Sequence, residues 1–334
     1  MRIFHDPRQR LHAPALELHN GGFTAYAEKP ERVDAMLAAL GAAEPPPDRG
    51  DGPIRAVHDA GYLDFLQAAP GLWREAGRAG DAIPYAFPVV GRRSLGLKRV
   101  DALMGRHSFD ATTPIGPHAY EASYWSAQAA LAAAHAVLGG ERAAFALCRP
   151  PGHHAGADYC GGYCHINAAA AAAQGMRDAG RARVAVLDID YHHGNGTQDI
   201  FWRRGDVLYA SVHADPATDY PFYWGHADEI GEGEGRGATL NLPLPHGTRL
   251  DAFRRAQAAA LEAVARFGAE ALVVSFGADT WKGDPISHFA LETDDYAVLA
   301  RDIAVCGLPT AIVMEGGYAV DALGENVASF LSGF

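Results

Sequence analysis

The stretch VLDIDYHHGNGTQD, residues 186–199, places aspartates, two adjacent histidines and two glycines directly behind an apolar run. The run itself, RVAVLDI at 183–189, is short and rich in β-branched residues, as is typical of a buried strand. Carboxylates and imidazoles are costly to bury unless a metal, a proton-transfer chain or a polar turn uses them. We therefore expect a core strand here, with a candidate site at its carboxyl end.

Apolar runs of strand length recur along the chain and alternate with helical segments. Further strands are predicted at 143–148, 207–213, 238–242, 271–277 and 310–315. Helices are predicted at 31–40 behind Pro30, and at 121–138, 166–180, 250–267 and 293–305. This alternation indicates an α/β fold with a mostly parallel sheet covered on both faces. A length of 334 residues is compatible with a single domain over 1–334.

Composition and charge exclude several classes of protein. The chain is 49% hydrophobic, and its formal net charge is −12, from 28 basic and 40 acidic residues. Nucleic acid is not expected as a partner, because phosphate binding needs a concentrated basic surface. The charged opening MRIFHDPRQRLHAP and the lack of an apolar run of about 18 residues argue against a leader or a membrane span. Four cysteines are too few for a disulfide scaffold, so the cytoplasm is the expected location.

The segment 80–121 shows no sustained period and contains several glycines and prolines. A loop of this length inside a compact domain is usually functional. We expect an insert that forms a substrate rim or a subunit contact.

Polar side chains follow four of the predicted strands. They are His153 and His154 after 143–148, Asp188, Asp190 and His192 at the end of 183–189, Asp279 and Asp284 after 271–277, and Tyr318 after 310–315. In parallel α/β sheets, ligands bind beyond the carboxyl ends of the strands. One such cluster could be a structural turn, but four that meet at one edge predict a functional site.

Asp190 and His192 lie two residues apart and point the same way if the backbone is extended. With Asp279 they make a set of one histidine and two aspartates. Catalytic zinc sites use three protein ligands and leave the fourth position to water or substrate. Asp279 alone could instead be a helix N-cap, but beside the other two residues the ligand role is favoured.

Two adjacent histidines, His153 and His154, lie in the proline- and glycine-rich loop RPPGHHAG. Such a loop is a poor place for two ordinary core histidines, so we interpret them as proton-transfer groups. Tyr318 follows Gly316 and Gly317, and this turn could bring its hydroxyl to a reacting oxygen.

These motifs resemble the zinc-dependent histone deacetylase and acetylpolyamine amidohydrolase superfamily, and most of all its bacterial polyamine-deacetylase branch. The resemblance runs along nearly the whole chain and implies an arginase-like three-layer α/β fold with long loops at the strand ends. It is densest in FALCRPPGHHAG, GGYCHINAAA, VLDIDYHHGNGTQDIF, SFGADTWKGDP and VMEGGY.

The resemblance implies a role for each matching residue. Asp190, His192 and Asp279 would bind one Zn²⁺ per chain. His154 would be the general base and acid, oriented by Asn195, while Asp188 would orient His153 and stabilise its protonated form. Tyr318 would donate a hydrogen bond to the tetrahedral oxyanion. The activity implied is removal of acetyl or other acyl groups from small N-acetylated amines by metal-activated water.

The resemblance also implies a substrate tunnel and a structural cation. Gly162 and Tyr163 match one tunnel wall, and Tyr223 is the candidate for the opposite wall. A K⁺ or Na⁺ ion would be held around Asp188, Asp190, His192, Ser211 and Val212. A homodimer is expected.

Two other functions remain as alternatives. A binuclear manganese ureohydrolase shares the fold, but its extra carboxylates are missing, because Gly194 and Gly277 stand where they belong. A catalytically inactive binding protein is disfavoured, because every catalytic position is filled.

The substrate is left open between acetylpolyamines, acetyl-lysine and other N-acyl amines. Asp101 matches one of the acidic positions by which the polyamine branch attracts polycations, but Thr112 stands at another. The segment also carries a basic run, Arg92, Arg93, Lys98, Arg99 and Arg106, which weakens the polyamine assignment.

Overall fold

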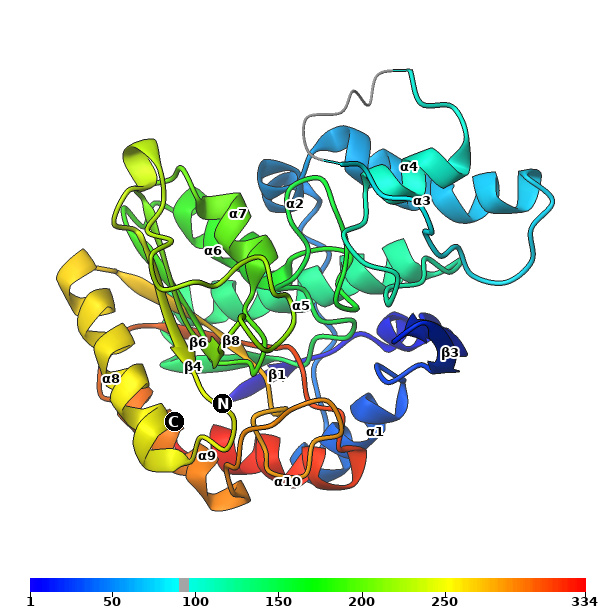
Figure 1. The fold of residues 1–334 in the computed structure, drawn as a ribbon. Helices are drawn as coiled ribbons and strands as arrows, with labels where there is room; N and C mark the ends of the chain where they lie inside the picture. Colours follow the sequence, from blue (N-terminus) through cyan, green and yellow to red (C-terminus); the bar gives the residue numbers. More distant parts are fainter. Residues whose placement is uncertain (90–95) are drawn as a thin grey trace.

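The computed structural model describes residues 1–89 and 96–334, and a seven-stranded parallel sheet forms its centre (Figure 1). The strand order is β1-β4-β9-β8-β5-β6-β7. The strands are β1 Arg2–Phe4, β4 Ala143–Ala146, β5 Val184–Asp188, β6 Val207–Ala214, β7 Thr239–Leu244, β8 Ala271–Phe276 and β9 Thr310–Met314. The predicted α/β class and the mostly parallel sheet are confirmed.

Helices cover both faces of the sheet and give three layers (Figure 1). On one face, α5 (Ala119–Leu138) packs on β1, β4 and β9, and α6 (Ala168–Asp178) packs on β5 and β8. The other face carries α8 (Leu250–Phe267), α9 (Thr293–Ala304) and α10 (Val320–Leu331). The remaining helices are α1 Glu31–Leu40, α2 Gly52–Val57, α3 Ala60–Glu75, α4 Val100–Arg106 and α7 Asn195–Phe201, with 3₁₀ turns at Pro7–Leu11 and Gly233–Gly235.

Local sequence explains where these helices begin and end. The Asn167 side chain accepts a hydrogen bond from the Ala170 N–H at 2.9 Å and so caps α6. Helix α8 ends at Phe267 and is capped by Gly268, whose φ of 72° is left-handed and therefore suits glycine. None of the helices in the described residues is long and apolar enough to cross a membrane.

The core strands are aligned, so that their carboxyl ends meet at one edge. Asp188, the last residue of β5, pairs with Ser275 on β8 and with Ser211 on β6. Strand β5 is buried along its whole length. This register brings together the loops after β5 and β8, two of the four strand ends where the sequence predicted a functional site.

Several elements were not predicted from the sequence, among them the helices α2, α3 and α7. Strand β1 is only three residues long and is too short to show a period. The hairpin of β2 (Leu16–His19) and β3 (Gly22–Ala25) turns on Asn20 and Gly21, which both have positive φ and form a recognised hairpin signal. Helix α4 lies inside the segment 80–121, where no periodic structure was expected. Arg92 and Arg93 of the basic run lie outside the described residues.

Candidate active site

The structure brings Asp190, His192 and Asp279 together in the buried interior beyond β5 and β8. His192 Nδ1 lies 3.3 Å from Asp190 Oδ1 and 3.2 Å from Asp279 Oδ2. Ligand atoms of a tetrahedral zinc site are roughly 3.3 Å apart, given bonds of about 2.0–2.1 Å. The donor types and their spacing therefore fit one zinc ion with a fourth position left open.

Main-chain groups hold the two carboxylates in place. Asp190 accepts hydrogen bonds from the N–H of His192 at 2.9 Å and of Gly316 at 2.8 Å. Asp279 accepts one from the N–H of Tyr191 at 3.0 Å. These bonds fix the carboxylates before any ion binds.

Two glycines make room for the cluster. A Cβ at Gly277 would lie 2.0 Å from Asp190 Oδ2, and a Cβ at Gly316 would lie 2.3 Å from Asp279 Oδ2. Because any side chain at either position would displace a carboxylate, the cluster depends on both glycines.

The charges in the cluster strongly perturb its protonation. Burial and the nearby Asp190 raise the pKa of Asp279 to about 7. Burial would lower the pKa of His192, but its hydrogen bonds to Asp190 and Asp279 raise it to about 10. Protons therefore compensate the buried carboxylates in the free protein, and a divalent cation could replace them.

The paired histidines lie side by side but differ in protonation. Their ring centroids are 4.0 Å apart, and His153 Nδ1 lies 3.1 Å from Asp188 Oδ2. Burial opposes the charge of His153, but Asp190 and Asp188 raise its pKa to about 10. Burial, then His153 and His192, lower the pKa of His154 well below its ordinary value. Near pH 7, His153 is therefore cationic and His154 is neutral.

A directional hydrogen-bond chain orients His154. Its Nδ1 lies 2.7 Å from Asn195 Oδ1, and Asn195 Nδ2 donates to the Tyr159 hydroxyl at 3.3 Å. Tyr159 in turn donates to Asp199 Oδ2 at 2.6 Å. Since each group donates toward Asp199, Asn195 presents its oxygen to His154, which therefore carries its proton on Nδ1. The free Nε2 can then accept a proton.

A cavity of about 600 Å³ reaches these groups from the surface. His154, His192 and Tyr318 all line it. Its other lining residues are Leu18, His19, Asn20, Phe109, Asp110, Thr112, Gly162, Tyr163, Thr218, Asp219, Tyr220, Pro221, Phe222, Tyr223, Trp224, Pro285, Ile286 and His288. The cavity is thus largely aromatic, and it ends at the candidate catalytic groups.

One wall of the cavity has an unusual backbone. Tyr163 has a φ of 67°, which is rare for a residue with a side chain. The Tyr163 N–H donates to Thr113 Oγ1 at 2.9 Å, and its hydroxyl donates to Glu17 Oε1 at 3.1 Å. A Cβ at the neighbouring Gly162 would lie 2.2 Å from the His154 ring, so glycine is required there.

Tyr318 lies beside this wall, with its ring centroid 5.5 Å from that of Tyr163. Its N–H donates to Asp284 Oδ2 at 2.6 Å, and the Arg32 guanidinium lies 5.0 Å from its ring centroid. These contacts hold the Gly-Gly-Tyr turn, and the ring is nearly buried at the cavity wall.

The opposite wall differs in detail from the prediction. Tyr223 lines the cavity, but it is 82% exposed and therefore lies at the rim. Tyr220 lies deeper, with its ring centroid 5.1 Å from that of His154, and its hydroxyl donates to Asp110 at 2.8 Å.

Among the described residues that line the cavity, Asp101 is absent. It lies on α4, where Arg78 and Arg99 both bind its carboxylate. Thr112 does line the cavity, and its hydroxyl donates to Asp110 at 2.9 Å.

The other expected residues lie at the strand ends. Ser211 and Val212 are on β6, beside Asp188 on β5. His193, for which we expect packing or hydrogen bonding, is buried with Nε2 3.2 Å from Asn241 Oδ1, and its ring packs on His213. This expectation is confirmed.

Sequence reasoning missed Tyr159, Asp199 and Asp110. Asp199 lies four residues after Asn195, and this spacing would have placed both on one face of a helix. Tyr159 and Asp110 lie in loops with no pattern that would have revealed them.

Comparison with known proteins shows the family to which the chain belongs. Residues 26–334 match the histone deacetylase domain, and the chain belongs to this family.

Individual relatives cover nearly the whole chain. Acetylpolyamine amidohydrolase 1 of Pseudomonas aeruginosa is 49% identical over 337 residues, which span 97% of this chain and 96% of that protein. The acetylpolyamine amidohydrolase of Mycoplana ramosa is 44% identical, over 100% of this chain and 99% of that protein. The crystal structure of an acetylpolyamine aminohydrolase from Burkholderia pseudomallei superposes with a TM-score of 0.96 at 44% identity, covering 100% and 98% of the two chains.

We predict that Gly277→Ala abolishes tight metal binding at Asp190, His192 and Asp279, because the added methyl group displaces the Asp190 carboxylate. Metal content after dialysis measures this loss. The matched control is Gly71→Ala on α3, where a Cβ would contact nothing within 4 Å. If Gly277→Ala binds as much metal as the wild type, the added methyl group does not displace the Asp190 carboxylate and the prediction is wrong.

Proposed function

We propose that the protein is a zinc-dependent amidohydrolase that removes the acetyl group from N-acetylated polyamines. The observation that carries this proposal is that His154, His192 and Tyr318 line one cavity. A candidate base, a candidate metal ligand and a candidate oxyanion donor thus face the same space. The names of the relatives support the substrate class.

Asp190, His192 and Asp279 would hold the zinc ion. When bound there, zinc supplies Lewis acidity, which polarises the scissile carbonyl and makes water acidic enough to lose a proton near neutral pH. His154 accepts that proton at Nε2 as water attacks the acyl carbon, since Asn195 engages Nδ1. His153 stays protonated beside Asp188, and its charge helps to keep His154 neutral before the reaction.

The Tyr318 hydroxyl donates a hydrogen bond to the oxyanion that develops on the acyl group. His154 then returns its proton to the nitrogen of the departing amine. The aromatic walls exclude water from the acyl group and hold a linear amine chain. Acetate and the free amine are the products.

The charges of the cavity favour a cationic substrate. Asp110 and Asp219 line it, and the lining residues in the described part of the chain include no lysine or arginine. An acetylpolyamine has a distal ammonium group that these carboxylates attract. An acetyl-lysine peptide is the second candidate, because it presents the same linear acetamide.

At the catalytic cluster, the space around the carboxylates supports one metal rather than the adjacent pair of a ureohydrolase. A Cβ at Gly194 would lie 2.3 Å from Asp188 Oδ2, and one at Gly277 would lie 2.0 Å from Asp190 Oδ2. Neither position has room for the extra carboxylate that a second metal needs. An inactive binding protein is disfavoured because the base, its orienting chain and the candidate ligands are all present.

We also propose that residues 1–334 form one deacetylase domain in a cytoplasmic homodimer, and that the segment 80–121 is a substrate rim or subunit contact. A bridge between Ala82 and Ile115 closes this segment, and Phe109, Asp110 and Thr112 bring it to the cavity. A structural K⁺ or Na⁺ would be held by Asp188 and by the carbonyl groups of Asp190, His192, Ser211 and Val212.

We predict that Tyr318→Phe lowers kcat by about 10²–10³, because it removes one oxyanion donor. Zinc content should not change, because the hydroxyl is not a proposed ligand. Tyr120→Phe on α5, outside the cavity, is the control. Near-normal turnover of Tyr318→Phe would refute the assigned role.

We predict that Asn195→Asp moves the acid limb of the kcat/KM profile to higher pH by about 1–3 pH units. A carboxylate at Nδ1 raises the pKa of His154, so the base becomes protonated at a higher pH and is lost earlier on acidification. The measurement is the pH dependence of kcat/KM for both proteins. An unchanged acid limb would show that His154 is not the base.

We predict that acetylputrescine or acetylspermidine is hydrolysed with a higher kcat/KM than an acetyl-lysine peptide. Side-by-side rates under one set of conditions test the substrate class. If the peptide is the better substrate, the enzyme is a protein or peptide deacetylase and the polyamine assignment is wrong.

A further inference from the structure

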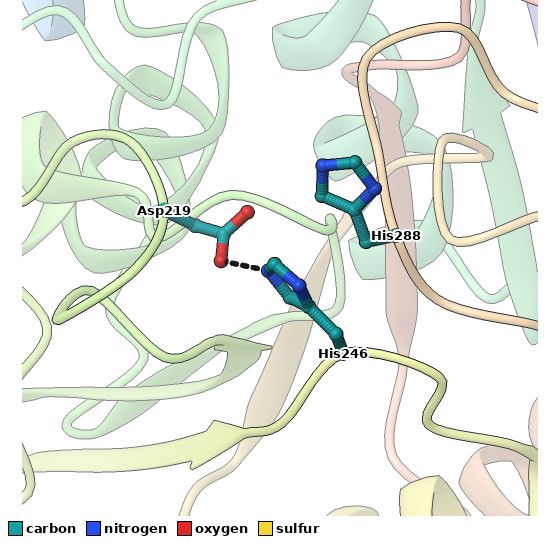
Figure 2. A group of neighbouring side chains, drawn as sticks. All are labelled: Asp219, His246 and His288. Atoms are coloured by element: carbon teal, nitrogen blue, oxygen red, sulfur yellow. Dashed lines mark hydrogen bonds and ion pairs between the residues drawn. The ribbon is translucent and has the colours of Figure 1, made fainter.

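A second group of metal-binding side chains lies outside the catalytic cluster. Asp219, His246 and His288 each offer one ligand atom, and these three atoms lie within 4.8 Å of one another. Figure 2 shows that the three side chains come from different loops and gather around one space. Asp219 and His288 also line the substrate cavity, so this rim cluster lies beside the path of the substrate.

Main-chain hydrogen bonds hold the three loops together. The Gly247 N–H donates to the His288 carbonyl at 2.7 Å, and the Ala290 N–H donates to the Thr248 carbonyl at 2.8 Å. The Asp215 N–H donates to the Leu244 carbonyl at 2.9 Å. The ring centroids of His246 and His288 are consequently only 4.5 Å apart. These bonds fix the positions of the three loops that carry the side chains.

The Asp219 carboxylate is oriented from behind. Its Oδ1 accepts a hydrogen bond from the Tyr191 hydroxyl at 2.6 Å, and its Oδ2 accepts one from Thr218 at 2.7 Å. His246 Nε2 also bonds to Oδ2 (Figure 2). Outer hydrogen bonds of this kind position the ligands in many metal sites. Although burial opposes it, hydrogen bonds from Tyr191, Thr218 and His246 lower the pKa of Asp219, so it remains a carboxylate.

We propose that Asp219, His246 and His288 form a second metal site, which binds a divalent transition-metal ion such as Zn²⁺. Two imidazoles and one carboxylate suit zinc and its neighbours, whereas Mg²⁺ and Ca²⁺ prefer oxygen ligands alone. The ion takes the place of the proton between Asp219 and His246. The His246 side chain is 48% exposed, so the ion can enter from solvent and keep a water ligand.

The site has a consequence for the substrate, which rests on the proposed function. A bound dication cancels the negative charge of Asp219 and adds positive charge to the cavity wall. A polyamine chain is cationic, so the occupied site weakens its binding and raises KM. Free zinc then acts as an inhibitor at the rim, in addition to the zinc that catalysis needs.

The test is the number of zinc ions bound per chain after equilibrium dialysis against micromolar free Zn²⁺. The wild type is expected to bind two. His288→Gln and His246→Gln should each bind one, because the rim cluster then keeps two ligands only. The control is His135→Gln, an exposed histidine on α5, which should still bind two. Asp219 is left unchanged because its anchor, Tyr191, lies between Asp190 and His192.

A wild type that binds one zinc, or a His288→Gln variant that still binds two, would overturn the proposal. Asp279→Asn separates the two sites, because it should lose the catalytic ion and keep the rim ion. A binuclear centre would lose both ions in that variant and would also overturn the proposal. These counts do not depend on turnover, so they stand even if the protein hydrolyses no acetylpolyamine.

Discussion

The structure depends on two carboxylates that are buried next to each other. Asp190 and Asp279 follow β5 and β8, which are neighbouring parallel strands, so the register of the sheet forces their side chains into one small space. Gly277 and Gly316 leave that space open, and main-chain N–H groups fix the oxygens. Two like charges in a buried site are stable only with a cation or protons beside them. This requirement explains the adjacent imidazole of His192 and the fit to a divalent metal.

The same charges divide the work of the two histidines. His153 faces Asp188 and Asp190 and is cationic, whereas His154 faces the neutral amide of Asn195 and is not. Behind Asn195, Tyr159 and Asp199 fix the direction of every hydrogen bond, and this sets which nitrogen of His154 is free. Groups that do not touch the reacting atoms therefore determine which nitrogen of His154 accepts the proton.

Much of this could be predicted from the sequence, because strand ends in a parallel sheet meet at one edge. The alternation of apolar strands and helices predicted the sheet, and the polar residues after four of those strands predicted the candidate cluster. Other features depend on tertiary contacts between segments that are far apart in the sequence. Nothing local shows that Tyr220 lies against His154 while Tyr223 lies at the rim, because both belong to one irregular loop. Asp101 matched by position alone; Arg99 is only two residues away in the sequence, but the pairing with Arg78 depends on how the chain after α3 lies against α4. The rim cluster joins three loops whose contact no periodicity reveals.

The most direct test of the central claim is zinc add-back to the chelator-stripped His288→Gln variant, in which only Asp190, His192 and Asp279 should hold the ion. One equivalent of Zn²⁺ is expected to raise Tm and restore hydrolysis together. Free zinc at 100 times Kd should add about 2.7 kcal/mol of stability. Full hydrolysis by the stripped protein, or a Tm that zinc does not change, would contradict the account.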